Sequence, residues 1–204
     1  MPDVGLKNIK SKIIDNVLMK NIGLRAVIII RRRTADGKFI SGSEKYSEKP
    51  FVMPLGAVPI GLQKKFSKEE GFKSSKQSVA ENEFQIFTAA SGAKWVWIGG
   101  GYKRYRQLNG RQVDKVDLNW SGRMMRNLGL IPGTTTPRET QVGFTGADEK
   151  QKALWHNTLG AGKSKVKREF MNFTAEEYNS LVQFAGDEIA KKIKTALTNY
   201  TVAA

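Results

Sequence analysis

The chain has no cysteine and a single histidine, His156, among its 204 residues. Without cysteine it can form no disulfide, no thiolate zinc site and no cysteine nucleophile. With one histidine, the common metal sites that combine a second histidine with carboxylates cannot be assembled. No serine stands in a Gly-x-Ser-x-Gly elbow, and the glutamate pairs at 69–70 and 176–177 are adjacent in sequence, so their side chains point apart. The sequence therefore predicts a protein with no enzymatic activity and no cofactor.

Long apolar runs are also missing from the sequence. No stretch approaches the ~20 apolar residues that a helix needs to cross a bilayer. The N-terminus lacks the apolar segment of a secretory signal peptide. We therefore expect a protein that is made in a cytosol-like compartment and has no membrane partner.

Acidic residues are few. The 34 lysines and arginines face 19 aspartates and glutamates, which gives a net charge of +15 and a pI near 10.0. A field of this sign attracts nucleic acid and acidic protein surfaces. The excess is spread along the chain rather than gathered in one tail. It fits a protein that lies near DNA and equally well one that lies against an acidic partner.

The first half of the chain contains one ambiguous segment and one long connection. Residues 6–22 have helical periodicity. The β-branched run Val27–Ile30 that follows has two interpretations: local propensity favours a strand, and a helix that runs on to Arg33 would make it part of a long basic N-terminal helix. Residues 41–82 have little periodicity beyond some structure near 51–60, and they predict an extended arm or loop insertion within a single domain, 1–204. Residues 84–88 and 95–98 predict a β-hairpin.

The second half ends in the clearest element of the sequence. A short helix at 123–128, a short strand at 140–144 and a helix at 149–158 come first. Thr174 and Glu177 then have the spacing of a capping box at the start of a helix, with Phe173 and Tyr178 placed as its hydrophobic staple. An apolar stripe from Tyr178 to Leu197 predicts that this helix covers the core. Strands and helices interleave without a βαβ rhythm, so the predicted class is α+β.

Two basic segments are candidates for contacts with DNA or with an acidic partner. The segment Tyr102–Arg106 interleaves rings with Lys103, Arg104 and Arg106, and Trp95 and Trp97 precede it, a composition that can stack on bases and bind phosphates. The second is the run Arg31, Arg32 and Arg33. Solvated or half-buried helix faces contain the same residue types. For both segments such a structural role is the commoner interpretation, ahead of a phosphate contact.

Three groups of residues occur in an order that resembles a known family. The first is Arg31-Arg32-Arg33-Thr34-Ala35-Asp36-Gly37-Lys38-Phe39 followed by Lys45-Tyr46-Ser47. The second is Gly101-Tyr102 through Tyr105-Arg106, followed by Asp117-Leu118-Asn119-Trp120-Ser121-Gly122-Arg123-Met124-Met125. The third is Trp155-His156-Asn157, followed by Arg168-Glu169-Phe170-Met171-Asn172-Phe173-Thr174-Ala175-Glu176-Glu177. Together they resemble the tail-component and virion-morphogenesis (tail completion) proteins of tailed bacteriophages, and residues 48–99 look like an insertion relative to that pattern.

The resemblance implies a fold and a role. It favours a long N-terminal helix through Val27–Ile30, so we expect a small mixed or antiparallel sheet flanked by that helix and the C-terminal amphipathic helix. It implies a non-enzymatic structural protein of the virion, assembled in the host cytoplasm as a homo-oligomeric ring of six copies in the neck or head-proximal tail. Other neck and tail proteins would be its partners, and packaged DNA would be contacted without sequence specificity. The motif residues expected to pack the subunit are Trp120, Ser121, Gly122, Arg168 and Phe170.

An alternative function is a free-standing nucleic-acid-binding protein without sequence specificity. It predicts that the affinity for nucleic acid falls as salt is added. The slope of log affinity against log salt concentration would give the number of phosphates that the protein neutralises. It also predicts that charge reversal at Arg104 and Arg106 abolishes the binding.

Overall fold

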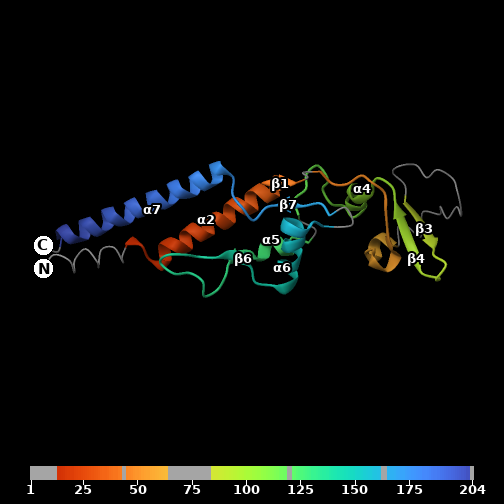
Figure 1. Cartoon of the computed structure of the whole chain (residues 1–204), viewed down its shortest axis with the longest axis horizontal. Coiled ribbons are helices and arrows are strands. Elements are labelled where there is room, and N and C mark those ends of the chain that lie inside the picture. The colour runs from red at the N-terminus through yellow and green to blue at the C-terminus, as the bar shows by residue number, and fades with distance from the viewer. Residues whose placement is uncertain (1–12, 43–44, 64–83, 119–120, 162–164, 203–204) are drawn as a thin grey trace. The chain divides into compact units, whose positions relative to one another are not determined.

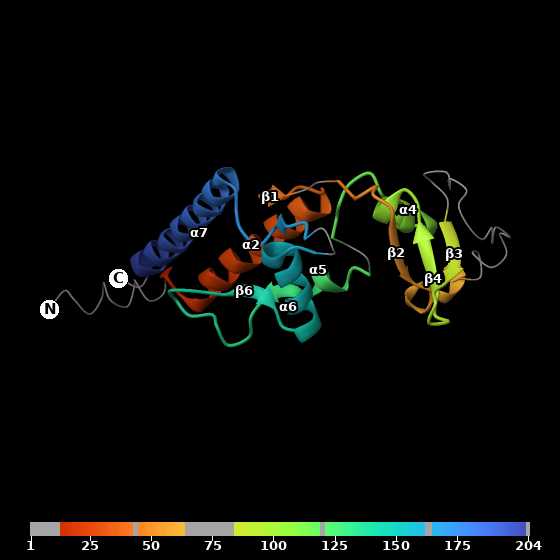
Figure 2. The same cartoon turned by 45° about the vertical axis from the view of Figure 1, so that its right-hand side comes forward.

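The computed structural model describes residues 13–42, 45–63, 84–118, 121–161 and 165–202 (Figures 1 and 2). The protein is of the α+β class, with small antiparallel sheets and long helices near both ends of the chain. Its contacts form two compact units. The helical unit combines residues 1–44 with 117–204, and the sheet unit is formed by residues 45–116. The sheet unit contains residues 48–99, and it also contains the motif residues at 45–47 and 101–106.

The helical unit is built on two long helices that lie side by side in both views (Figures 1 and 2). Helix α2 spans Asn16–Ala35 and helix α7 spans Ala175–Val202. Asp15, which precedes α2, accepts a hydrogen bond from the Lys192 ammonium at 2.6 Å, far along α7. Arg33, near the end of α2, pairs with Glu177 in the first turn of α7, so the two helices run antiparallel.

The ambiguous segment Val27–Ile30 is helical and forms part of α2. Val27 and Ile30 lie inside it and are 4% and 2% exposed. The burial of these side chains in the core outweighs the modest strand propensity of a β-branched run. Asp15 caps the helix, because its carboxylate accepts a hydrogen bond from the Leu18 N–H at 2.8 Å.

Shorter elements complete the helical unit. They are β1 (Ser41–Gly42), α5 (Arg123–Asn127), β5 (Leu128–Leu130), β6 (Val142–Phe144), α6 (Ala147–Leu154), the π-helix η2 (Trp155–Leu159) and β7 (Arg168–Glu169). β5 pairs with β6 and β1 pairs with β7, both antiparallel. The short helix, the strand and the helix predicted at 123–128, 140–144 and 149–158 are confirmed within a few residues, except that the last is a shorter α-helix continued by η2.

The core of the helical unit joins segments that are far apart in sequence. Phe170 is fully buried at its centre and contacts Phe144 edge to face, with ring centroids 6.3 Å apart. The buried members of this core are Val27, Ile30, Met124, Leu128, Phe144, Ala153 and Phe170. The core therefore depends on α2, α5, β5, β6, α6 and the segment before α7 together.

The helix α7 begins as predicted but is covered on a different face. The Thr174 N–H donates to the Glu177 carboxylate at 2.9 Å and the Glu177 N–H donates to the Thr174 hydroxyl at 3.2 Å, which confirms the capping box. The expected core-covering stripe is wrong in its outer members: Tyr178, Val182, Ile193 and Leu197 are 59%, 53%, 40% and 58% exposed. The helix packs on α2 through a neighbouring face that carries Leu181, Phe184, Glu188 and Lys192, all half-buried.

The sheet unit contains one three-stranded antiparallel sheet of order β2-β4-β3. These strands are β2 (Phe51–Pro54), β3 (Phe84–Thr88) and β4 (Lys94–Ile98), so the predicted hairpin is confirmed as β3–β4. The short 3-10 helix η1 (Leu55–Ala57) follows β2, and helix α4 (Gly101–Leu108) follows β4. Val96 and Ile98 are fully buried on one face of β4, and strand alternation places Trp95 and Trp97 on the other face.

From residue 45 on, the described part of the predicted arm belongs to the sheet unit, whereas Ser41 and Gly42 form β1 of the helical unit. Residues 51–54 pair with residues 95–98 of β4, and Val58 and Leu62 are buried at 2% and 4% exposure. Residues 64–83 of the arm lie outside the described residues. β2 and these two buried side chains tie residues 45–63 to the sheet unit, while most of the other side chains in this stretch are exposed.

Candidate basic site and assembly surface

The basic segment Tyr102–Arg106 folds as helix α4. Chain entry into this helix needs glycine, because Gly101 has φ +66° and a Cβ there would lie 2.5 Å from the Ser47 carbonyl oxygen. The Lys103 N–H donates to that same oxygen at 3.0 Å, which fixes the helix start against the segment before β2. The Lys103 ammonium pairs with the Glu48 carboxylate at 2.7 Å. This hydrogen bond, followed by the charge of Lys103, lowers the pKa of Glu48.

The aromatic rings of this segment pack within the sheet unit. Tyr102 contacts Tyr46 and Tyr105, with centroids 5.7 and 6.0 Å apart, and Tyr105 contacts Phe51 at 6.1 Å. Tyr105 is 7% exposed, and burial, with a smaller effect of Tyr102, raises its pKa. The ring of Tyr105 is therefore not placed to stack on a base. Helix α4 packs on the sheet face that carries Phe51, Val96 and Ile98. The two tryptophans of β4, Trp95 and Trp97, lie on the other face of the sheet.

Arg106 is not at the surface where the sequence analysis expects a phosphate contact. It is 2% exposed, its Nε donates to the Gln112 carbonyl at 3.0 Å, and its guanidinium lies 4.5 Å from the centroid of the Tyr46 ring. A cation held between a ring and a carbonyl organises the end of α4. For this residue the structure corrects the expectation of a surface contact.

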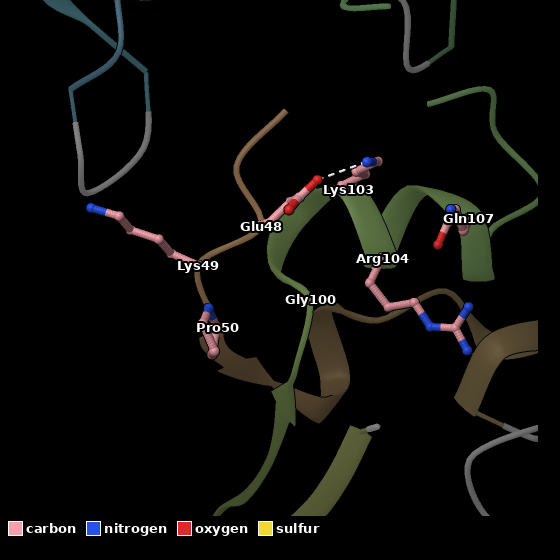
Figure 3. Close-up of a pocket in the computed structure, with 7 residues that line it drawn as sticks. All are labelled: Glu48, Lys49, Pro50, Gly100, Lys103, Arg104 and Gln107. Carbon is pink, nitrogen blue, oxygen red and sulfur yellow. Dashed lines mark hydrogen bonds and ion pairs between the residues drawn. The ribbon is translucent and has the colours of Figure 1, made fainter. Parts of the chain in front are cut away.

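An open basic hollow of about 540 Å³ lies beside α4 (Figure 3). Its lining residues are Glu48, Lys49, Pro50, Gly100, Lys103, Arg104 and Gln107. Three cations face one carboxylate here, so the hollow is suited to anions. In Figure 3 the charged ends of Lys49 and Arg104 point away from each other, and Lys103 turns to Glu48. The arrangement suits diffuse attraction of a polyanion rather than a tight clamp on one phosphate.

The three arginines at the end of α2 have three different surroundings. Arg31 donates from Nη2 to the carbonyls of Arg126 and Leu128, at 2.9 and 2.6 Å, and so ties α2 to the end of α5. Arg32 is exposed and lines a second hollow of about 420 Å³. Arg33 is 7% exposed and binds within the helical unit, so the structure also corrects the expectation of a surface contact for this residue. Charge runs in a sequence do not distinguish these three cases.

Arg33 holds the segment before α7. It donates to the Phe170 carbonyl at 2.6 Å and to the Asn172 carbonyl at 2.8 Å, and it forms an ion pair with the Glu177 carboxylate. On the other side of this segment, the Asn157 side-chain oxygen accepts hydrogen bonds from the N–H groups of Phe170 and Met171, at 2.9 and 3.0 Å. Asn157 was not singled out as a contact from the sequence, although it belongs to the third motif.

The remaining motif residues have structural surroundings where they are described. Trp120 lies outside the described residues. Ser121 accepts a hydrogen bond from Arg126 through its carbonyl at 3.0 Å, and Gly122 is the N-cap of α5, with φ +74°. Arg168 is 8% exposed in β7, and Phe170 forms the centre of the core. Arg168 and Phe170 are thus buried, whereas Ser121 is exposed.

His156, the one histidine of the chain, has a half-buried side chain in η2. Its Nδ1 is buried and accepts or donates no hydrogen bond among the described residues. Burial, and then the nearby charge of Arg168, lowers the pKa of His156 to about 4. The imidazole is therefore neutral at pH 7. Within the described ranges no three or more histidine, aspartate and glutamate side chains gather as metal ligands.

The helical unit exposes apolar side chains on both long helices. On α7 they are the outer stripe members named above. On and just before α2, Ile14, Val17, Leu24 and Ile28 are 39%, 58%, 42% and 55% exposed. Their spacing of three, seven and four residues places them on one face of a helix. This apolar periodicity is present in the sequence and could have predicted the exposed face. Exposed apolar faces of this kind mark interaction surfaces.

No described helix combines the length and the apolar character needed to cross a bilayer. Comparison of the chain with protein-family models, with curated proteins and with solved structures found no match.

Proposed function

We propose that the chain is a structural virion protein of a tailed bacteriophage, a ring-forming neck or tail completion component without catalysis. The observation that carries this proposal is that residues of all three motif segments meet in the helical unit. A shared order of motifs is expected when the motif residues build a common subunit fold. Here they contact one another across long sequence separations.

The contacts between the motif segments are specific. Arg33 from the first segment holds the carbonyls of Phe170 and Asn172 from the third. Met124 from the second segment is buried in the same core as Phe170. Asn157 binds the backbone of the third segment from its own first part. These residues serve the fold, as expected for an assembly protein whose function lies in its surfaces.

The exposed faces of α2 and α7 supply surfaces for assembly. A ring subunit needs two sides that neighbouring subunits cover. We expect six copies in the ring, other neck and tail proteins as further partners, and a location in the virion neck after assembly in the host cytoplasm. The net charge of +15 suits a channel that DNA passes without being read.

The test is the mass of the purified protein by light scattering, without nucleic acid, at low and high salt. We expect a ring-sized oligomer, visible as rings in negatively stained micrographs. A mass of one or two copies under all conditions, with a shift only when DNA is added, contradicts the ring and favours nucleic-acid binding.

The basic hollow beside α4 favours this second candidate function. A double variant, Lys49→Glu with Arg104→Glu, reverses two cations of the hollow, and Arg111→Glu reverses an exposed cation outside it. If the hollow binds DNA, the double variant loses affinity by about tenfold or more at low salt. The slope of its log affinity against log salt concentration is also smaller, by the equivalent of about two phosphate contacts. An equal loss per charge in Arg111→Glu assigns the binding to net charge alone.

A further inference from the structure

The exposed face of α2 has the spacing of a seam between two helices. The seam residues are Val17, Asn21, Leu24 and Ile28. They follow one another at intervals of four, three and four residues, which are the intervals between the a and d positions of a heptad. The apolar members are 58%, 42% and 55% exposed, and Asn21 is half-buried. A second helix can therefore lie along α2 over about 17 Å, on the side that faces away from the core.

The charges beside this seam are all positive. Lys20 stands at a g position, and Arg25 and Arg32 stand at e positions, which flank a and d and form the ion pairs between two helices. Within the part of the chain that the structure describes, none of these three cations has a carboxylate at ion-pair distance. Arg31, at the next d position, binds backbone carbonyls. The seam is thus apolar along its middle, and the positive charge on both sides has no counter-charge.

The carboxylates near the ends of α2 leave this excess in place. Asp15 is held by the Lys192 ammonium at 2.6 Å. Asp36 lines the hollow of about 420 Å³ together with Arg32 and the exposed Lys38, so cations outnumber its charge there. The second carboxylate of that hollow, Glu177, is paired with Arg33.

This combination of side chains selects an acidic helix among the surfaces that could cover the seam. A second α2 would bring the cations of both copies together at the flanking positions. A helix that lies in a membrane presents Trp, Phe and Leu on its apolar face, whereas this seam has no aromatic ring and has the amide of Asn21 in its middle. The phosphates of DNA would meet the cations and leave the apolar side chains in water. An amphipathic helix with acidic flanks satisfies both the apolar and the charged part of the surface.

We propose that the outer face of α2 docks an acidic amphipathic helix of another protein. That helix carries apolar residues at a and d, a polar residue opposite Asn21, and glutamate or aspartate at e and g. The inference rests on the proposed function, in which other neck and tail proteins are partners, and it states the surface that one of them presents. Contacts between copies of this chain then use other parts of the subunit.

A designed peptide serves as the probe for the acidic helix. It has three heptads, about 21 residues, with isoleucine at a, leucine at d, one asparagine at a central a position and glutamate at e and g. Fluorescence anisotropy measures its binding to the full chain at low salt. We expect saturable binding that weakens as salt is added, and much weaker binding of a shuffled peptide of the same composition. No binding of the acidic peptide, or equal binding of the shuffled one, overturns the proposal.

A pair of apolar variants locates the contact on α2. Ile28→Asp is expected to weaken binding of the acidic peptide by about tenfold or more. The matched control is Val182→Asp on α7, which is expected to bind as the wild type does. The side chains replaced are 55% and 53% exposed, and circular dichroism checks that both variants stay folded. An equal loss in the two variants overturns the assignment to α2.

A charge swap tests the flanking cations. Lys20→Glu with Arg32→Glu is expected to weaken binding of the acidic peptide by about tenfold or more and to bind instead a peptide in which lysine replaces glutamate. The control is Lys150→Glu with Lys152→Glu, two exposed cations of α6. An equal loss in the control assigns the binding to net charge and overturns the proposal.

Light scattering of the same samples separates this proposal from the ring. A ring-sized oligomer that does not bind the peptide overturns the proposal and leaves the ring, and if Ile28→Asp also breaks that oligomer, a second copy covers the seam. A monomer that binds the peptide through Ile28 contradicts the ring and supports the proposal. Without peptide binding, a loss in Ile28→Asp of binding to vesicles of equal parts phosphatidylglycerol and phosphatidylcholine, or to duplex DNA, assigns the seam to that surface and overturns the proposal.

Discussion

Arg33 of α2 forms an ion pair with Glu177 in the first turn of α7, and both side chains are largely buried, at 6% and 19% exposure. The same Glu177 oxygen accepts the hydrogen bond from the Thr174 N–H. The carboxylate thus caps α7 and fixes its start to the end of α2. The two long helices of the helical unit are joined at this point by charge as well as by packing.

Replacement of Arg33 by lysine is expected to destabilise the helical unit although the charge is kept. A single ammonium cannot reach Glu177 and the two carbonyls that the guanidinium fork binds. We expect the free energy of unfolding to fall by about 2–4 kcal/mol, measured by urea unfolding and far-UV circular dichroism. The neighbouring exposed Arg32→Lys is the control, with a change within about 0.5 kcal/mol. Equal midpoints for the two variants contradict the importance of the Arg33 contacts.

The capping box predicts a larger loss of stability for Thr174→Ala than for a threonine replaced inside α7. Thr174→Ala removes the hydroxyl that accepts the Glu177 N–H and is expected to lower stability by about 1 kcal/mol. Thr195→Ala, within α7, removes only a hydrogen bond to the Lys191 carbonyl on an exposed face and is expected to be neutral or slightly stabilising, since alanine is the better helix former. Thermal unfolding of both variants checks the difference. A loss in Thr195→Ala as large as that in Thr174→Ala would assign the effect to something other than the cap.

Two glycines of the sheet unit with similar positive φ angles distinguish the cost of backbone strain from the cost of a steric collision. Gly101 has φ +66° and Gly110 has φ +64°, but a Cβ at Gly110 meets nothing within 4 Å. Alanine at either position carries the left-handed penalty of about 1–2 kcal/mol. Gly101→Ala in addition collides with the backbone of Ser47 and Glu48, which adds about 1–3 kcal/mol. Comparable losses for both variants in chemical denaturation would show that the close approach at Gly101 relaxes easily.

The low pKa of His156 predicts a pH dependence. Folding lowers this pKa from 6.5 to about 4, so between these values the unfolded chain binds more protons than the folded one. The stability that comes from keeping the ring neutral is complete above pH 6.5 and decreases as the pH falls towards 4, by about 3 kcal/mol in total. Urea midpoints between about pH 5 and pH 7 should decrease with falling pH in the wild type and change less in His156→Gln. Parallel pH profiles contradict the burial of a neutral imidazole.

Local signals in the sequence correctly predicted several elements. The β3–β4 hairpin, the capping box of Thr174 and Glu177 and the class α+β follow from residues close together in the chain. Alternation, periodicity and caps act over a few residues, so they can be read without knowing the partners. The same signals left Val27–Ile30 open between helix and strand, because the answer depends on what those side chains pack against.

The sequence alone determined the order and type of most elements, a strongly basic surface and an amphipathic final helix. Only the tertiary structure decided that Arg33 and Arg106 are buried while Arg32 is exposed, and which face of α7 is covered by α2. The physical reason is separation along the chain. The partners of Arg33 lie 137 to 144 residues away, and no local pattern specifies which carbonyl or carboxylate will meet a given arginine. Burial of a charge is decided by the groups that fold around it.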